Sequence, residues 1–261
     1  MIKTALITGA ASGLGYELSI LLAKDNYRLI LVDIDKEALN AAKKNLESEF
    51  NVEVITLVKD LSTPNVAQDI INDINDIAID VLINNAGFGL FGSFASTNWE
   101  RESAMLHVHV ITTTHLTKLV LEGMVKRGAG KILNMSSLAA FQPGPLMSIY
   151  YASKGYMLSF SEAIANELKG TGVTVTALCP GPTKTAFQKT VSQETSCNNK
   201  ITFNMASAKE VALYGYKAMK KGKAYAIPGR FNKLLAIIPR LIPRKSAVSI
   251  VRKIQEKNRV S

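Results

Sequence analysis

Cysteine and histidine are scarce in this chain of 261 residues, which contains 2 of the former and 3 of the latter. The two cysteines, Cys179 and Cys197, belong to no CxxC pair and have no histidine cluster beside them. This pattern indicates neither a disulfide framework nor a zinc site. The sequence therefore predicts no bound metal, and a reducing compartment is the default for such a chain.

Long apolar runs are also missing. No uninterrupted run approaches the roughly 18 residues that a membrane span needs. The apolar part of the N-terminal stretch MIKTALITG is too short for a signal peptide. Apolar residues nevertheless make up 47 % of the chain, which supports a large core and argues against disorder. We expect a folded cytoplasmic protein, with any membrane contact confined to the periphery.

Acidic residues are rare in the C-terminal quarter. Residues 200–261 contain 15 Lys/Arg and 2 Asp/Glu, a balance of +13, whereas residues 1–199 hold the remaining 16 and 19, a balance of −3. A basic segment of this kind can attract anionic lipid, an acidic carrier protein, phosphorylated substrates or nucleic acid, or simply be a solvated surface. No nucleic-acid-binding motif accompanies the charge, so nucleic acid is not the expected partner.

Short apolar segments rich in β-branched residues alternate with stretches of helical periodicity. Strands are expected at residues 4–8, 28–33, 52–58, 79–83, 131–135, 173–178 and 223–227. Helices are expected after the first strand, near 36–49, 64–75, 99–127 and 208–221, and around position 150. This alternation predicts a parallel sheet with right-handed crossovers. The expected fold class is α/β, a single doubly wound Rossmann-type domain over residues 1–261, with about seven strands and helices on both faces.

Gly9, Gly13 and Gly15 follow the first strand and precede leucines at helical spacing. Glycines permit close approach of a backbone, and a helix N-terminus offers unpaired N–H groups to an anion. The context indicates a phosphate-binding turn, although glycines also serve tight corners between a strand and a helix.

Asp33 ends the second strand, 18 residues after Gly15. An acid there suits the ribose hydroxyls of NAD and repels the 2′-phosphate of NADP, so NAD is the predicted cofactor. The alternative is an acidic strand end that leads into the next helix. Asp60 and Asn85 also follow strands, and ligands of parallel sheets bind beyond the carboxyl ends of the strands. Core packing does not require polar side chains at all of these ends.

Tyr150 and Lys154 lie four residues apart, and therefore on one face of a helix, one turn from each other. An ammonium group near a phenol stabilises the phenolate and lowers the phenol pKa from its ordinary value of about 10. At about 4 Å and an effective dielectric of about 20 the attraction is about 4 kcal/mol, or up to roughly three pKa units. Such a tyrosine can exchange protons near neutral pH, as alcohol–ketone interconversion requires. Taken alone, the pair is more simply two ordinary side chains of a surface helix.

Four motifs, in order, resemble those of the short-chain dehydrogenase/reductase family between Lys3 and about Ile227. TGxxxGxG is matched by Thr8, Gly9, Gly13 and Gly15, NNAG by Asn84–Gly87, YxxxK by Tyr150 and Lys154, and PG by Pro180 and Gly181. Each motif is modest alone, but four in order, at the expected strand ends, do not arise by chance. The resemblance implies an NAD(P)-dependent oxidoreductase that interconverts an alcohol and a ketone or aldehyde by hydride transfer.

The resemblance also implies roles for individual residues. Ser137, 13 residues before Tyr150, is preferred over Ser136 as the hydroxyl that polarises the carbonyl. Tyr150 is the implied general acid/base, preferred over Tyr151 because only Tyr150 has Lys154 at i+4. Lys154 supports the phenolate and binds the nicotinamide ribose.

The implied cofactor-binding residues are spread along the chain. They are Gly9, Ser12, Gly13, Leu14, Gly15, Asp33, Asp60, Leu61, Asn85, Ala86, Gly87, Tyr150, Lys154, Pro180, Gly181, Thr183 and Thr185. Family members that prefer NADP usually carry a basic residue before the second motif glycine or after strand two. Ser12 and Ile34–Asp35 occupy those places here, which again favours NAD. A homodimer or homotetramer and a small-molecule substrate are the implied partners.

One position departs from the family pattern. The family has an asparagine in an M-x-x-x-N context, whereas Met105 is followed here by His109. The asparagine is thought to hold a water that links the lysine to solvent, and a histidine can donate and accept through its two nitrogens. His109 is therefore either part of a catalytic relay or a histidine without a catalytic part.

The candidate substrate-pocket residues are mostly apolar, which points to a hydrophobic acyl, steroid-like or retinoid-like alcohol or ketone. They are Phe88, Leu138, Ala139, Leu146, Met147, Pro182 and Phe187. Residues 1–100 form the expected cofactor-binding half, 101–229 the catalytic half, 184–206 a candidate substrate loop and 230–261 a basic C-terminal extension.

Within the extension, Ser246 is expected to cap a helix that carries Val248, Val251 and Ile254 opposite several basic residues. Such a segment can lie on an anionic membrane surface, pack over the substrate cleft or form an oligomer contact.

Two other functions stay open. One is a non-catalytic dinucleotide-binding sensor or scaffold on the same fold, for which the change at His109 is the only support. The other is an NADPH-dependent 3-oxoacyl reductase that acts on a carrier-bound acyl chain.

Overall fold

A parallel sheet of seven strands forms the centre of the computed structural model, which describes residues 2–75, 77–185 and 205–259. The strands lie in the order β3-β2-β1-β4-β5-β6-β9, and every neighbouring pair is parallel. Their bounds are β1 Thr4–Thr8, β2 Arg28–Asp33, β3 Val54–Val58, β4 Val81–Asn84, β5 Gly130–Met135, β6 Val173–Leu178 and β9 Tyr225–Ala226. The expected α/β class and doubly wound sheet are confirmed.

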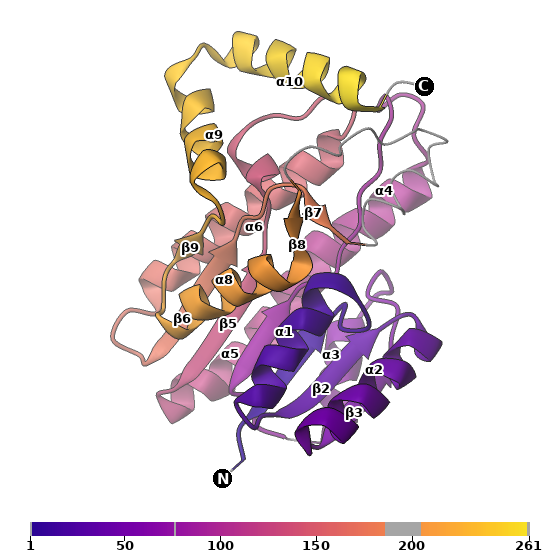
Figure 1. Cartoon of the computed structure of the whole chain (residues 1–261), viewed down its shortest axis with the longest axis vertical. Helices are drawn as coiled ribbons and strands as arrows, with labels where there is room; N and C mark the ends of the chain where they lie inside the picture. The colour runs from indigo at the N-terminus through magenta and orange to yellow at the C-terminus, as the bar shows by residue number, and fades with distance from the viewer. Residues whose placement is uncertain (1, 76, 186–204, 260–261) are drawn as a thin grey trace.

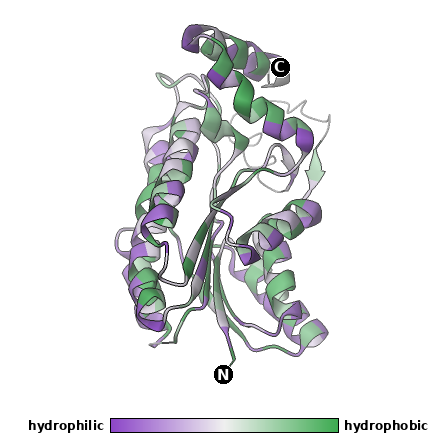
Figure 2. Ribbon diagram, turned by 90° about the vertical axis from the view of Figure 1, so that its left-hand side faces the viewer, coloured by the Kyte–Doolittle hydropathy of each residue, from purple (hydrophilic) through white to green (hydrophobic). Residues whose placement is uncertain are grey.

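Helices cover both faces of the sheet, as the edge-on view in Figure 2 shows. Successive residues of a strand point to opposite faces, so Ile7 and Leu31 pack with α1, α2 and α8, whereas Leu6 and Ile30 pack with α3 and α5. The bounds are α1 Gly13–Lys24, α2 Lys36–Phe50, α3 Val66–Asp73, α5 Thr113–Arg127, α6 Ser148–Glu167 and α8 Ala208–Lys220. Both cores consist mainly of Leu, Ile, Val and Ala side chains that are almost fully buried.

The helix expected over residues 99–127 is interrupted. It consists of α4, Trp99–Leu106, a π-helical segment η1, His107–Thr112, and then α5. The Thr113 hydroxyl donates to the Val108 carbonyl at 2.9 Å, five residues back, at the end of this wider turn. The segment contains His109, and π-turns of this kind are frequent at functional sites.

The strand order reverses between β1 and β4, where the chain continues in opposite directions across the sheet. Ligands of doubly wound sheets bind at such a switch point, outside the carboxyl ends of the strands. A short 3₁₀ helix η2, Leu138–Phe141, follows β5 at this edge, and the two-stranded pair β7, Thr183–Lys184, and β8, Ala206–Ser207, follows β6.

The C-terminal extension forms two helices, α9, Arg230–Leu241, and α10, Arg244–Arg259, which lie beyond the carboxyl ends of the strands (Figure 1). The expected cap at Ser246 is wrong. The Pro243 carbonyl already accepts from the Ala247 N–H at 3.1 Å, so the helix begins at Arg244 and Ser246 lies in its first turn. In the part of the chain that the structure describes, no helix combines the length and apolar character needed to cross a bilayer.

Candidate active site

The glycine turn between β1 and α1 is built for close backbone approach. Gly9 and Gly13 have φ angles of +62° and +56°, a region that side chains disfavour. A Cβ added to Gly15 would lie 2.0 Å from the Gly9 carbonyl oxygen. The turn therefore requires glycine at these positions, and its N–H groups at the start of α1 face the edge of the sheet where an anion can bind.

Asn85 holds this turn in place. Its side-chain amide donates to the carbonyls of Thr8 and Gly9 at 3.0 and 2.9 Å. In return, the Thr8 hydroxyl oxygen accepts from the backbone N–H groups of Asn85 and Ala86 at 3.1 and 3.2 Å. The NNAG segment after β4 is thereby fastened to the glycine turn after β1, across the switch point.

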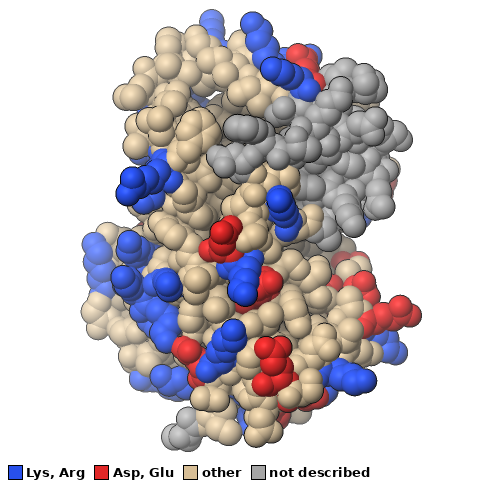
Figure 3. Space-filling view, viewed as in Figure 1, with Lys and Arg blue, Asp and Glu red and all other residues tan. Residues whose placement is uncertain are grey.

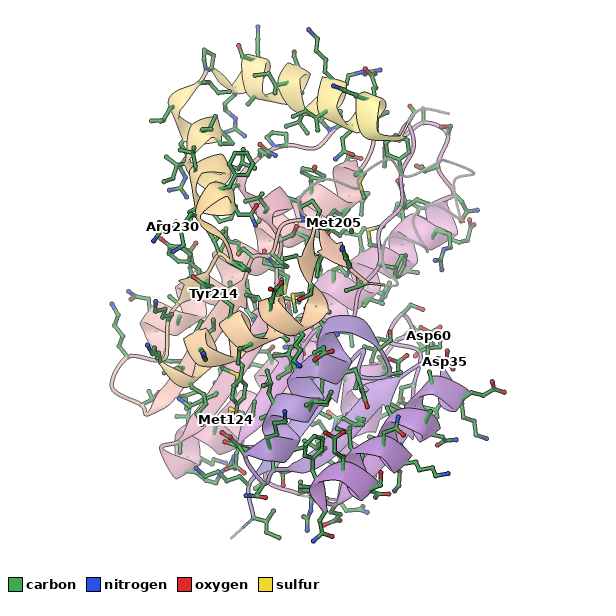
Figure 4. The ribbon with its side chains drawn as sticks, in the orientation of Figure 1. Asp35, Asp60, Met124, Met205, Tyr214 and Arg230 are labelled. Atoms are coloured by element: carbon green, nitrogen blue, oxygen red, sulfur yellow. The ribbon has the colours of Figure 1, made fainter. Side chains whose placement is uncertain are left out.

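Two carboxylates lie at the ends of β2 and β3. Asp33 accepts from the Ala11 N–H at 2.9 Å through one oxygen and from the Asp35 N–H at 3.2 Å through the other. Asp60 accepts from the N–H and hydroxyl of Ser62 at 2.9 and 2.7 Å, and Figure 4 labels it together with Asp35 at this edge. A carboxylate has about four lone-pair sites, so Asp33 can still accept from ribose hydroxyls.

Lys154 lies one turn after Tyr150 on α6 and is buried, with 5 % of its surface exposed. Its ammonium lies 5.7 Å from the centre of the Tyr150 ring and donates to the Met135 carbonyl at 3.0 Å. Burial lowers the pKa of Lys154 to about 8, because leaving water disfavours the charged form. The pair is therefore not an ordinary feature of a surface helix.

The two serines after β5 have different surroundings. The Ser136 hydroxyl is buried and donates to the Lys154 carbonyl at 2.9 Å, which fixes it to α6. The Ser137 oxygen accepts from the Ala139 N–H at 3.1 Å at the start of η2 and keeps its own proton to donate. This difference supports Ser137 over Ser136 as the reactive hydroxyl.

His109 makes contacts with both ring nitrogens. Nε2 accepts from the Phe88 N–H at 3.2 Å, so the ring proton resides on Nδ1, which lies 2.8 Å from the Ser153 hydroxyl. That hydroxyl in turn donates to the Tyr150 carbonyl at 2.9 Å. Burial, and secondarily the charge of Lys154, hold the pKa of His109 well below its ordinary value of 6.5, so the ring is neutral.

Nearly all the predicted cofactor and catalytic residues line one cavity of about 780 Å³. Gly15 and His109 are the exceptions among the predicted residues that the structure describes. Of the predicted substrate-pocket residues, Phe88, Leu138, Ala139, Met147 and Pro182 line this cavity. Leu146 does not line it; its backbone has φ +67° and its carbonyl accepts from the Gly92 N–H. Phe187 and most of the 184–206 loop lie outside the described residues.

The far wall of the cavity was not included among the predicted site residues. It is formed by α9, α10 and the turn between them, through Leu235, Ile238, Ile242, Ala247, Ile250, Val251, Ile254 and Gln255. Gln255 donates to the Tyr151 hydroxyl at 2.6 Å, which ties α10 to the residue next to Tyr150. The amphipathic spacing of the extension is the only sequence signal for this wall. Arg101, over the Phe88 ring, also lines the cavity and was not predicted.

A sequence model described as short chain dehydrogenase matches residues 3–196. The chain belongs to this family. Among similar proteins, a mouse (Mus musculus) very-long-chain 3-oxoacyl-CoA reductase is 28 % identical over 244 residues, covering 90 % of this chain and 75 % of that protein. A 17-beta-hydroxysteroid dehydrogenase type 3 of Rattus norvegicus is 30 % identical, covering 92 % of this chain and 76 % of that protein.

The fold agrees with this assignment. The structure of a short-chain dehydrogenase from Sphingobium yanoikuyae, solved in complex with NADPH, matches with a TM-score of 0.82 and 28 % identity, over 92 % of this chain and 95 % of that one. As a short-chain dehydrogenase the protein is an NAD(P)-dependent oxidoreductase of alcohol and carbonyl groups, as the motifs predicted.

Proposed function

We propose that this short-chain dehydrogenase interconverts a lipophilic secondary alcohol and its ketone, with Tyr150 as general acid/base. The observation that carries the proposal is the shared cavity. Ser137, Tyr150 and Lys154 line it between the dinucleotide-type turn at Gly9 and an apolar wall from α9 and α10. The side chains suited to acid/base chemistry therefore lie in the same cavity as an apolar wall that can bind a substrate.

The residues present fit a nicotinamide dinucleotide. The turn leaves no room for a side chain at Gly9 or Gly15, holds Gly13 at a positive φ, and would receive the pyrophosphate at the N-terminus of α1. Asp33 would accept from the adenosine ribose, and the segment from Pro180 to Thr185 would hold the nicotinamide end. When bound, the nicotinamide supplies or accepts the hydride.

The protein's own part is acid/base chemistry and electrostatic stabilisation. In reduction, the Tyr150 and Ser137 hydroxyls donate hydrogen bonds to the carbonyl oxygen, and Tyr150 delivers its proton as negative charge develops there. In oxidation, the Tyr150 phenolate accepts the hydroxyl proton. The buried Lys154 ammonium, one turn away, stabilises that phenolate.

His109 is, in this proposal, a positioning residue. Its ring nitrogens contact Phe88 and Ser153, and it does not line the cavity. Through Ser153 it holds the backbone of Tyr150, and through Phe88 it holds the segment after β4. Of the two alternatives for this position, the described contacts favour the one without a proton relay.

We propose NAD as the preferred cofactor. Asp33 would lie against the 2′-phosphate of NADP, and neither Ser12 nor Ile34 supplies a compensating positive charge. The Sphingobium protein was solved with NADPH, so this fold also accommodates that dinucleotide. The discriminating feature in this chain is the carboxylate at the end of β2.

A 3-oxoacyl thioester is the second candidate substrate. The mouse relative is named for a very-long-chain 3-oxoacyl-CoA. In this chain the apolar wall of α9 and α10 would accept an acyl chain, and Arg101 on the cavity wall offers a cation to an anionic carrier group. Reduction of 3-oxoacyl thioesters much faster than of free ketones of equal chain length would favour this candidate.

Separate replacement of the two adjacent tyrosines by phenylalanine tests the assignment of Tyr150 as general acid/base. Tyr150→Phe should retain dinucleotide binding but lose turnover by about 10²-fold or more, the usual contribution of a general acid. Tyr151→Phe is the matched control and should keep turnover of a small ketone, because Tyr151 contacts Gln255 of α10. Absorbance of the reduced nicotinamide follows turnover with a panel of ketones. Near-wild-type turnover in Tyr150→Phe would overturn the proposal.

A further inference from the structure

Helix α9 exposes a continuous apolar stripe. Its members are Phe231, Leu234, Ile237, Ile238 and Leu241, each between 37 and 77 % exposed. The spacing of i, i+3, i+6, i+7 and i+10 from Phe231 places them on one helical face. Ala236, on the other face, is 3 % exposed and packs toward the body of the protein. Five large apolar side chains in water on one helix mark an interaction surface.

The stripe reaches the rim of the cavity. Ile238 lines the cavity and is also 37 % exposed. On α10, Ile250 and Ile254 line the cavity too and are 49 and 52 % exposed. The apolar wall of the chamber and the apolar outer surface are therefore joined at this rim. Figure 2 shows the hydrophobic colouring of α9 at the end of the molecule that lies beyond the sheet.

Basic side chains accompany the apolar ones. Residues 230–257 contain eight Lys/Arg, all exposed, at 230, 233, 240, 244, 245, 252, 253 and 257. Glu256 is the one acid in this range, and it is paired with Arg252 at 2.8 Å. Figure 3 shows Lys and Arg gathered over α10 at the top of the molecule. The surface thus combines apolar side chains with a strong positive charge.

We infer that the outer surface of α9 and α10 docks on an anionic lipid bilayer, with the rim of the cavity facing the membrane. The apolar stripe would enter the interfacial region, and the basic side chains would contact headgroup phosphates. A second copy of this chain suits the surface less well, because two such faces would bring like charges together. The docking itself does not depend on the proposed reaction. Docked in this way, the cavity could receive a lipophilic substrate from the bilayer, and that consequence rests on the proposed function.

Vesicle sedimentation with the full chain tests the docking. The protein should bind vesicles of phosphatidylcholine with phosphatidylglycerol, more weakly as salt rises, and bind pure phosphatidylcholine at least tenfold less. Leu234→Glu/Leu241→Glu should reduce binding at least tenfold. Neither residue lines the cavity, so turnover of a small water-soluble ketone should be unchanged and also reports intact folding. Leu234→Ser/Leu241→Ser repeats the test without added negative charge.

Val125→Glu is the matched control, since Val125 is 40 % exposed on α5, outside this surface, and vesicle binding should persist. Equal binding of wild type and both double variants would overturn the inference, as would absence of binding to the anionic vesicles. Loss of a dimer in the double variants, without vesicle binding by the wild type, would assign the surface to a second copy instead. Vesicle binding is measured without turnover. A failure of the docking inference can therefore be told apart from a failure of the proposed reaction.

Discussion

At the residue scale, Lys154 is proposed to act through its positive charge, yet it is buried, where a charge is costly. Burial lowers its pKa to about 8 in the folded chain, whereas the ordinary value is 10.5. Between these two pH values the unfolded chain binds the proton and the folded chain does not. The free energy of unfolding should therefore gain a contribution from Lys154 as pH rises from about 8 to 10.5.

Lys154→Met makes this measurable. At pH 7 the folded wild type still carries the buried ammonium, whereas the variant buries no charge. The variant should therefore be more stable at pH 7 by up to about 3 kcal/mol, less the lost bond to Met135. The advantage should shrink as pH rises through the same window. Urea unfolding of both proteins at several pH values gives the difference, and Lys118→Met, an exposed lysine on α5, is the control. A difference independent of pH would contradict the buried charge.

His109 gives a second test at this scale. Because its pKa lies well below 6.5, the ring should stay neutral through the range near pH 6–7 and contribute no limb to the pH profile of kcat/KM. His109→Phe keeps an aromatic ring but loses the contacts to Phe88 and Ser153, and should lower kcat about tenfold or more without changing the shape of the profile. A limb in the wild type that disappears in the variant would instead identify a proton relay.

At the scale of elements, α10 is attached to the active site by the Gln255–Tyr151 hydrogen bond. Gln255 is 7 % exposed and closes the apolar wall next to Tyr150. Gln255→Leu keeps the size of the side chain and removes the bond, so KM for a bulky apolar ketone should rise several-fold, equivalent to about 1 kcal/mol. Turnover of a small ketone should change little.

Tyr151→Phe should have the same effect on bulky ketones, and the double variant should add little, because both changes remove one contact. Arg252→Ala, exposed on the same helix, is the control for a general disturbance of α10. Strictly additive effects of the two changes would show that the bond does not couple the residues.

The same elements show what the sequence could and could not predict. Strand ends such as Asp33 and Asn85 were predictable, because an apolar run followed by a polar residue is a local pattern. The partners of His109 were not, since Phe88 and Ser153 lie 21 and 44 residues away on other elements. Likewise, amphipathic spacing in α10 indicates which residues share a face, but not that this face closes the cavity over Tyr151.

At the scale of the whole molecule, the cavity unites residues from the turn after the first strand to the last helix, from Gly9 to Gln255. A dinucleotide bound there would contact the folded chain only, and at 100 times its Kd it would stabilise that state by about 2.7 kcal/mol. For a chain of this size the midpoint of thermal unfolding should rise by about 5–10 °C. Thermal unfolding can therefore measure the cofactor preference without any knowledge of the substrate.

NADH should produce the larger shift, and NADPH at the same concentration a smaller one, because its 2′-phosphate would lie against the Asp33 carboxylate. Asp33→Asn should narrow the difference, since it removes the repulsion, although it also weakens the contacts to Ala11 and Asp35 and so lowers the starting midpoint. An equal or larger shift with NADPH in the wild type would reverse the proposed preference. In that case a cation of the cavity wall would determine the cofactor preference. Lys59, which lies beside Asp60 just after β3, would be the first candidate.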